Sequence, residues 1–259
     1  MARTQGAHRR ATRTRSASAV LKRFVNVAMF AILLVQMLQQ YVPSEVHEVA
    51  GMAFAVLFLV HMVQQRRWFA GLVRGKWTVL RALQTLVNAA CLAYGVALLG
   101  SGLYMSPVID DLLGIQSGFA TARSVHLMAT YGGLVACSVH LGMHARAMVG
   151  FMRKCFAPQG LPGAGRWVVR VAVAIVAVYG AYSFMRMGLF GFISGAVPYA
   201  FFDTDRPVLL SLLDFASICV LFGVAGYAIA RGAALAGRTR KGGVVRVPRG
   251  RRAQMRNVR

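Results

Sequence analysis

Six apolar stretches, each long enough to cross a bilayer, constrain this chain more than any other feature of its sequence. A membrane-spanning helix needs about 20 apolar residues, because lipid offers no hydrogen-bond partners to an exposed backbone. The predicted spans cover residues 24–42, 45–65, 78–105, 123–150, 167–185 and 208–230. The sequence therefore predicts an all-α integral membrane bundle of about six transmembrane helices.

The composition supports a membrane protein. Hydrophobic residues make up 57% of the chain and charged residues only 14%, whereas a soluble domain carries about a quarter charged residues. The net charge is +23, and the basic residues lie between the apolar stretches. This distribution indicates a membrane surface rather than nucleic acid as the partner. The four cysteines form no C-x-x-C or C-x-x-C-H motif, which argues against zinc, iron–sulfur clusters and covalently attached haem.

The distribution of charge predicts the orientation of the chain, because Lys and Arg in short loops are retained in the cytoplasm. Of the 30 Lys and Arg residues, all but Arg123, Arg186 and Arg206 fall on one predicted side, and the 7 acidic residues fall on the other. The basic segments are 1–23, 66–81, 146–170 and 231–259. We therefore expect a multi-pass protein with both termini in the cytoplasm.

Four regions follow from this layout. Residues 1–23 and 237–259 are predicted to be disordered basic cytoplasmic tails that contact anionic membrane lipid, with a nucleic-acid or protein partner as the alternative. Residues 24–150 form a predicted four-helix core, and residues 151–236 add two transmembrane helices. Between those two helices, residues 186–206 contain Phe190, Phe192, Phe201 and Phe202, which predicts a segment at the outer interface.

The histidines carry the predicted chemistry. Five of the six lie inside two spans: His47 and His61 in the second, and His126, His140 and His144 in the fourth. The separation from His47 to His61 is 14 residues, and so is that from His126 to His140. Fourteen residues of helix make about four turns and a rise of about 21 Å, which returns a side chain to nearly the same face. Each helix therefore offers one imidazole near each membrane surface.

Two such imidazoles facing each other across a bundle suit a planar macrocycle. The second and fourth spans run parallel, so His47 is level with His126 and His61 is level with His140. We predict that these pairs ligate the iron atoms of two non-covalent haem b groups. With both axial positions filled, such centres would pass single electrons across the bilayer, and no catalytic residue is predicted.

Several neighbouring residues fit this hypothesis. Phe54 and Gly133 each lie seven residues from both histidines of their helix, so one fills space where the other leaves it. Gly51 would let a macrocycle approach the backbone closely, and Arg123 would pair with a propionate. The alternatives are that the glycines serve helix packing and that the arginine only reaches toward the membrane surface.

His144 lies one turn beyond His140 and is an alternative inner ligand. The equal spacing in the two helices favours His140, which leaves His144 as a contact for a propionate, a quinone or a proton. A further alternative is that the histidines are hydrogen-bonded interior residues or ligands of a transition metal. Two matched pairs on parallel helices argue against that reading.

The histidine motifs also resemble a known bacterial group, the flavinylation-associated cytochrome family, over roughly residues 24–150. The resemblance rests on five short motifs. They are His47-Glu-x-x-Gly51, His61-x6-Trp68, Ser101-Gly102, Arg123-x-x-His126 and His140-Leu-Gly-Met-His144. It implies a bacterial cytoplasmic membrane protein with two b haems on His47, His61, His126 and His140. It also implies a redox partner outside the cell membrane that carries covalent flavin.

Three functions are therefore compared. The leading one is a di-haem subunit of a membrane oxidoreductase system, which relays electrons from the quinone pool or a cytoplasmic-side donor to an acceptor outside. The second is a self-sufficient membrane enzyme that oxidises quinol or reduces an acceptor. The third is a non-haem transporter or structural membrane protein whose histidines bind protons or metal.

Overall fold

The computed structural model describes residues 2–107, 111–112, 114, 117–145, 163–200 and 205–242. All regular elements in these residues are helices, and six of them are long and apolar enough to span a membrane. The six are α1 (Ala2–Gln36), α2 (Ser44–Gln64), α4 (Val79–Tyr104), α6 (Phe119–Met143), α8 (Gly163–Arg186) and α10 (Val208–Gly242). Short helices join them: η1 (Gln39–Tyr41), α3 (Arg66–Gly71) and α9 (Leu189–Ile193). The predicted all-α membrane bundle is confirmed.

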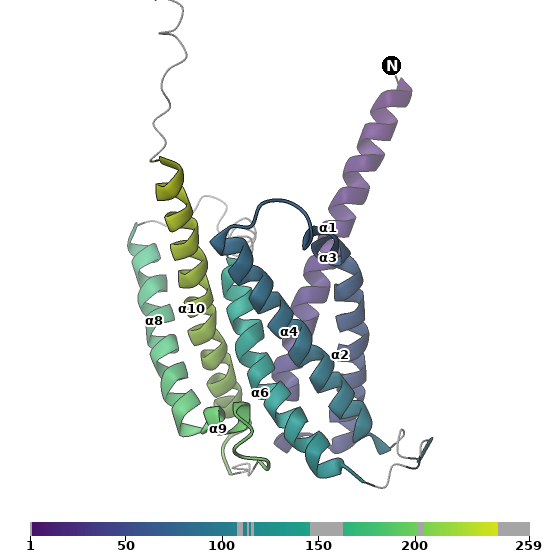
Figure 1. Ribbon diagram of the computed structural model, residues 1–259, viewed down its shortest axis with the longest axis vertical. Coiled ribbons are helices and arrows are strands. Elements are labelled where there is room, and N and C mark those ends of the chain that lie inside the picture. The colour runs from purple at the N-terminus through teal and green to yellow at the C-terminus, as the bar shows by residue number, and fades with distance from the viewer. Residues whose placement is uncertain are drawn as a thin grey trace, which may run out of the picture.

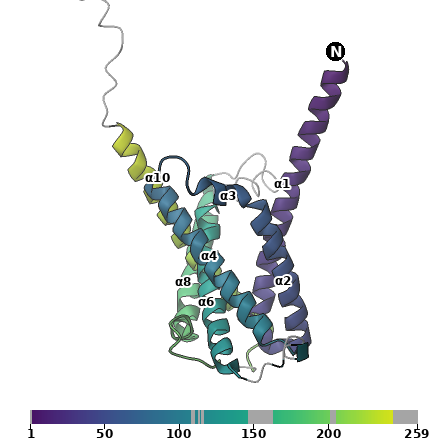
Figure 2. The same ribbon diagram turned by 45° about the vertical axis from the view of Figure 1, so that its right-hand side comes forward.

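The helices form one elongated bundle (Figure 1). α1 packs against α2, while α4, α6, α10 and α8 pack in that order. Figure 2 shows α1 and α10 extending beyond the bundle at the end where α3 lies. We call this the His61 end, and the opposite end, where α2 and α6 begin, the His47 end.

Several helix boundaries differ from the predicted ones. α1 ends at Gln36 instead of residue 42, because the chain turns through η1 before Pro43. α1 begins at Ala2 and α10 continues to Gly242, so helix extends into both segments predicted to be disordered. Ala, Arg and Lys are common there and favour helix. Cys155, Phe201, Phe202 and residues 243–259 lie outside the described residues.

Glycines bring α6, α8 and α10 into backbone contact. A Cβ atom added at Gly142 would overlap the carbonyl of Gly223, and one at Gly226 would overlap the carbonyl of Val139. Gly180 of α8 meets the backbone of α10 in the same way. Small residues at such crossings stabilise membrane helices because they allow close van der Waals packing. These contacts hold the last two long helices against α6.

A buried carboxylate also joins α8 to α10. Asp214 is 1% exposed and accepts hydrogen bonds from Tyr179 at 2.8 Å and Ser183 at 2.9 Å. Arg186 and Arg206 pair with its Oδ2 at 2.6 and 2.7 Å. The charge distribution predicted Asp214 at the outer rim, whereas it lies inside the helix pair, where two arginines and two hydroxyl groups offset the cost of burying its charge.

The segment between α8 and α10 packs onto the bundle as well as lying at its end. The Phe192 ring of α9 lies 4.9 Å from the Tyr131 ring of α6, and Leu189 is 1% exposed. Tyr41 of η1 donates a hydrogen bond to the Arg206 carbonyl at 2.6 Å. These contacts connect the start of α2, and therefore His47, to the α8–α10 pair.

Candidate metal-binding histidine pairs

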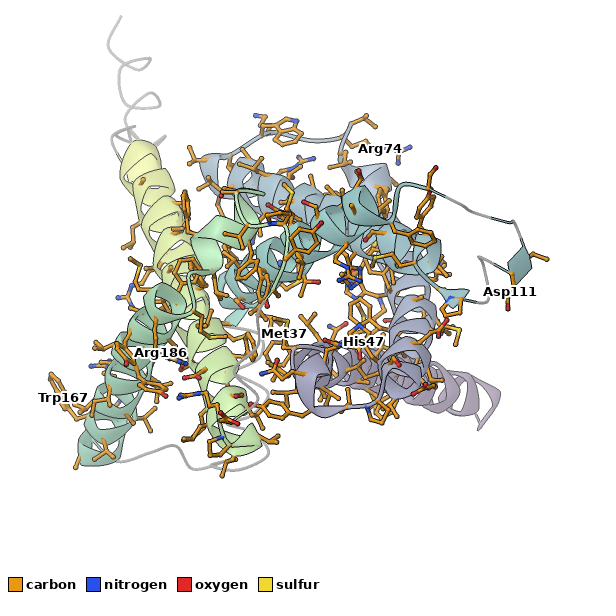
Figure 3. All side chains as sticks on the ribbon, turned by 90° about the horizontal axis from the view of Figure 1, so that it is seen from below. Met37, His47, Arg74, Asp111, Trp167 and Arg186 are labelled. Atoms are coloured by element: carbon orange, nitrogen blue, oxygen red, sulfur yellow. The ribbon has the colours of Figure 1, made fainter. Side chains whose placement is uncertain are left out.

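Two helices position five histidines: four lie within the helices, and His144 caps the end of α6. α2 holds His47 in its first turn and His61 in its last, and α6 holds His126 and His140 near its two ends. The single span α4 separates α2 from α6, so the two helices run in the same direction. Figure 3 shows the His47 side chain among the helices when the bundle is viewed from the His47 end.

His47 and His126 face each other across the bundle. Their ring centroids are 6.3 Å apart, and the ring planes make an angle of 65°. Two imidazoles on opposite sides of one metal ion, each at a metal–nitrogen distance of about 2 Å, have centroids roughly 6 Å apart. The distance between the two rings therefore leaves room for one metal atom that both imidazoles would hold.

A hydrogen bond from α4 fixes the proton on His126. Ser101 is buried, and its hydroxyl group donates to the Ala97 carbonyl at 2.6 Å. The same Oγ lies 3.2 Å from Nδ1 of His126. Because the one hydroxyl proton is directed to the helix backbone, Oγ accepts from Nδ1–H of His126. The neutral ring then has its lone pair on Nε2, the nitrogen available to a metal.

His47 is incompletely satisfied by the protein. Its Nδ1 is buried and has no hydrogen-bond partner among the described residues. Its backbone carbonyl accepts from Nε2 of Gln36 at 3.0 Å, which ties the first turn of α2 to α1. A buried polar atom without a partner costs about 1–3 kcal/mol. The hydrogen-bonding capacity of the His47 ring is therefore not fully used by the protein, unlike that of a purely structural histidine.

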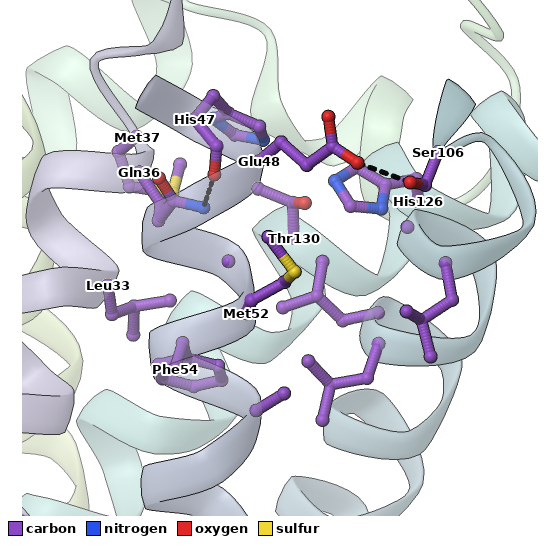
Figure 4. Close-up of a pocket in the computed structure, with 16 residues that line it drawn as sticks. Leu33, Gln36, Met37, His47, Glu48, Met52, Phe54, Ser106, His126 and Thr130 are labelled. Carbon is purple, nitrogen blue, oxygen red and sulfur yellow. Dashed lines mark hydrogen bonds between the residues drawn. The ribbon is translucent and has the colours of Figure 1, made fainter. Parts of the chain in front are cut away.

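A cavity of about 140 Å³ extends from these two rings (Figure 4). α1, α2, α4 and α6 all line it, and most of the lining is apolar. The main apolar side chains are Leu33, Met37, Met52, Leu98, Leu99 and Leu103. A macrocycle needs more space, since ligand pockets typically measure about 300–1,000 Å³. Met37 and Met52 are unbranched, so they are the side chains best able to repack around it.

The cavity has a polar rim at the His47 end. Ser106 donates a hydrogen bond to the Glu48 carboxylate there (Figure 4). Gly51 and Phe54 line the cavity as well. Gly102 also lines it, and a Cβ atom on this glycine would lie 3.3 Å from Cε1 of His126. The His126 ring therefore depends on a glycine for its position.

Two other predicted site residues lie away from the cavity lining. Arg123 is exposed, one turn before His126. Gly133 is buried, and its added Cβ would meet Cβ of Tyr94 at 3.5 Å. The adjacent Gly132 lies under the Tyr94 ring. The structure thus places Tyr94, rather than Phe54, against this pair of glycines.

At the His61 end, both paired histidines contact an asparagine. Nδ1 of His61 lies 3.0 Å from Oδ1 of Asn26 in α1, and Nδ1 of His140 lies 2.9 Å from Oδ1 of Asn88 in α4. His61 is close enough to His140 for the two rings to interact electrostatically. The described residues form pairs of imidazoles there, and no group of three or more His, Cys, Asp or Glu suited to a metal ion.

His144 lies one turn beyond His140, as its spacing predicted, and directly follows the last residue of α6. It is the C-cap of α6, where its backbone N–H returns to the carbonyls of His140 and Leu141. Its ring centroid is 4.9 Å from that of His140, at an angle of 53°. The residue is exposed. His140 and His144 therefore both reach the His61 end, and both remain candidate ligands.

Aromatic rings fill the middle of the bundle between the two pairs. Phe54 and Phe58 of α2 are buried, with ring centroids 6.5 Å apart and planes at 23°. The Phe58 ring reaches the space left by Gly95, where an added Cβ would lie 2.6 Å from the ring. This apolar filling separates the two imidazole pairs and excludes water between them.

Sequence reasoning gave no role to the polar residues that contact the histidines, although the Ser101-Gly102 motif includes one of them. α1 contributes Asn26 and Gln36, and α4 contributes Asn88 and Ser101. α2 and α6 supply the imidazoles, while α1 and α4 supply their hydrogen-bond partners. The signal in the sequence was the presence of amide side chains inside apolar spans. Such side chains are costly at membrane depth and usually have a function.

The fold and these pairs define a multi-pass helical membrane protein with histidines directed into its bundle. Comparisons with protein-family models, curated proteins and solved structures found no match.

Proposed function

We propose that this protein is a di-haem b cytochrome that carries electrons across a membrane. The facing His47 and His126 rings, with centroids 6.3 Å apart, are the observation that carries the proposal. The hydrogen bond from His126 to Ser101 supports it, because it leaves Nε2 free to bind. Haem iron with two axial imidazoles supplies reversible one-electron transfer without an open coordination position.

The chain's own residues have distinct roles in this proposal. His47 and His126 would hold one iron atom, while Leu98, Leu99 and the other apolar lining residues would keep water away from it. His61 binds the second with His140, or with His144 as the alternative. The two ligands of α2 are separated by 14 residues, or about 21 Å of helix, which covers most of the roughly 30 Å hydrocarbon core.

The direction of the chain follows from its charged ends. Arg66, Arg67, Arg74, Lys76 and Arg81 follow α2 or begin α4, so they lie at the His61 end. Glu45 and Glu48 lie at the other end. The positive-inside rule then supports a cytoplasmic His61 end and cytoplasmic termini. By the family resemblance, the membrane is the bacterial cytoplasmic membrane, the donor is quinol or a cytoplasmic-side protein, and the acceptor outside carries flavin.

Electron transfer in vesicles tests this function. We would incorporate the purified protein into liposomes that contain ferricyanide and add dithionite outside. We expect the ferricyanide to be reduced through the wild-type protein, and the rate to fall to that of protein-free liposomes for His126→Ala and for His61→Ala. His8→Ala, in the N-terminal segment, is the matched control and should keep the wild-type rate.

Two results would contradict the proposal. If the wild-type protein transfers no electrons although it carries haem, it is not a transmembrane relay. If it carries no haem when haem is supplied, a non-haem transporter or structural protein becomes the better reading.

A further inference from the structure

We infer that Asn26 and Asn88 are positioning residues that set the protonation and redox properties of the site at the His61 end. This inference rests on the proposed function, because it assigns residues that would act on the bound iron through His61 and His140. Asn26 lies on α1 and Asn88 on α4, so each asparagine comes from a helix other than that of its histidine.

The Asn26 contact determines which nitrogen of His61 carries the proton. Oδ1 of Asn26 lies 3.0 Å from Nδ1 of His61. A carbonyl oxygen only accepts, so Nδ1–H of His61 is the donor and the lone pair lies on Nε2. Asn26 lies inside the span Ala19–Gln36 and is exposed on the protein surface. In lipid no water competes for its oxygen, so the hydrogen bond with His61 persists.

The Asn88 contact has two orientations with opposite consequences. With Oδ1 facing His140 at 2.9 Å, Nδ1–H donates and Nε2 can ligate iron. With the amide turned over, its nitrogen donates to His140 Nδ1 and to the Gln84 carbonyl at 3.1 Å, and its oxygen accepts from Trp68 Nε1 at 3.0 Å. In that second orientation Nε2 carries the proton and cannot ligate. The second orientation satisfies both amide atoms, so iron binding by His140 would require the amide to turn to the first and to give up its hydrogen bonds with Gln84 and Trp68.

The same contacts predict how the iron would respond. A histidine whose Nδ1–H donates to a good acceptor becomes a more basic ligand, which favours the ferric state. With iron bound, two amide oxygens would accept from the two ligands at the His61 end. At the His47 end, Ser101 accepts from His126, and Nδ1 of His47 has no partner among the described residues. Changes at the asparagines should therefore shift one haem and leave the other unchanged.

Paired substitutions test the inference in the full-length protein. Aspartate keeps an acceptor oxygen and cannot donate as an amide does, whereas leucine removes the acceptor. We would measure haem per chain and both midpoint potentials by optical redox titration for Asn26→Asp, Asn26→Leu, Asn88→Asp and Asn88→Leu. Ser138→Ala is the control, because this buried hydroxyl group donates to its own helix at the Leu134 carbonyl rather than to a histidine.

We expect the potential of one haem to follow the order Leu above Asn above Asp at each position, with the second haem unshifted. Haem affinity at the shifted site should fall about 10–100-fold in the leucine variants and be retained in the aspartate variants. Unshifted potentials in all four variants would overturn the inference. So would loss of haem in Asn88→Asp with retention in Asn88→Leu, because the amide nitrogen would then be the partner. A wild type without haem would instead remove the proposed function.

Discussion

Ser101 shows how one hydroxyl group can prepare a ligand. It is buried in α4, donates to its own helix at Ala97 and accepts from His126. The consequence is an imidazole with its proton on Nδ1 and its lone pair on Nε2. No charge is needed for this arrangement, which suits a site inside a membrane, where charged groups are costly.

Ser101→Ala should weaken the site at the His47 end without abolishing it. The Nδ1–H of His126 would lose its acceptor, so haem affinity at that site should fall by about 10–100-fold. In the molecules that still bind haem at the His47 end, the midpoint potential of that haem should rise, because His126 becomes a less basic ligand. Haem titration and optical redox titration would measure both effects.

Ser101→Thr is the matched variant for this prediction, since it restores the hydroxyl group and should recover the wild-type potential. Equal potentials in the wild type, the alanine variant and the threonine variant would show that the hydrogen bond has no influence on the site.

The histidines could be predicted from the sequence, whereas their partners could not. The spacing of 14 residues on two parallel spans is enough to place His47 level with His126. The partners depend on the rotation of α1 and α4 about their axes. The apolar pattern of a span does not predict that rotation. For the same reason, the expected match of Phe54 with Gly133 gave way to Tyr94. The choice between His140 and His144 stays open.

At the scale of elements, α8 and α10 form a pair held by a buried ionic network. Arg186 and Arg206 keep side-chain exposures of 30% and 22%, while Asp214 is almost fully buried. Two partly exposed cations around one buried anion indicate a structural junction. The junction also reaches η1 through the bond from Tyr41 to the Arg206 carbonyl.

Asp214→Asn should destabilise the protein by roughly 3 kcal/mol, because removing one charge from a buried pair leaves its partners uncompensated. Thermal unfolding in detergent, followed by circular dichroism, would measure the loss. Haem content should stay at the wild-type value in folded protein, since Asp214 lies outside the histidine cavity. A variant with wild-type stability would contradict the structural role of this network.

The helices themselves could be predicted because each depends on the apolar residues of its own segment. A run of apolar residues long enough to cross the hydrocarbon core needs no knowledge of its neighbours. The ends were less predictable. The first span stops at Gln36 because of the turn before Pro43, and α6 stops at Met143, which leaves His144 as its cap. The burial of Asp214 was not predicted, because it depends on how α8, which carries Arg186, packs against α10.

At the scale of the whole molecule, the chain is a bundle with chemically different ends. The described residues place a cluster of exposed arginines after α2 and acidic residues at the start of α2. Between the ends lie two imidazole pairs separated by phenylalanine rings. The proposed electron relay requires such an arrangement, with one imidazole pair near each end of the bundle.

The orientation predicts the behaviour of reporter fusions. Green fluorescent protein fused after the last residue, or inserted after Gly75, should fluoresce, because the proposed orientation places both sites in the cytoplasm. Alkaline phosphatase inserted after Gly195 should be active, because the proposed orientation places this position outside. Phosphatase activity of a fusion at the C-terminus would contradict the assigned direction.

The central claim is that four histidines hold two haem groups, and a haem count per chain tests it most directly. A pyridine haemochrome assay on purified protein, with a protein determination, should give two non-covalent b haems in the wild type and in His8→Ala. It should give one in each of His47→Ala, His61→Ala and His126→Ala, and none in the double variant His47→Ala/His61→Ala. Wild-type protein without haem after expression with adequate haem supply, or two haems retained in every histidine variant, would contradict the account.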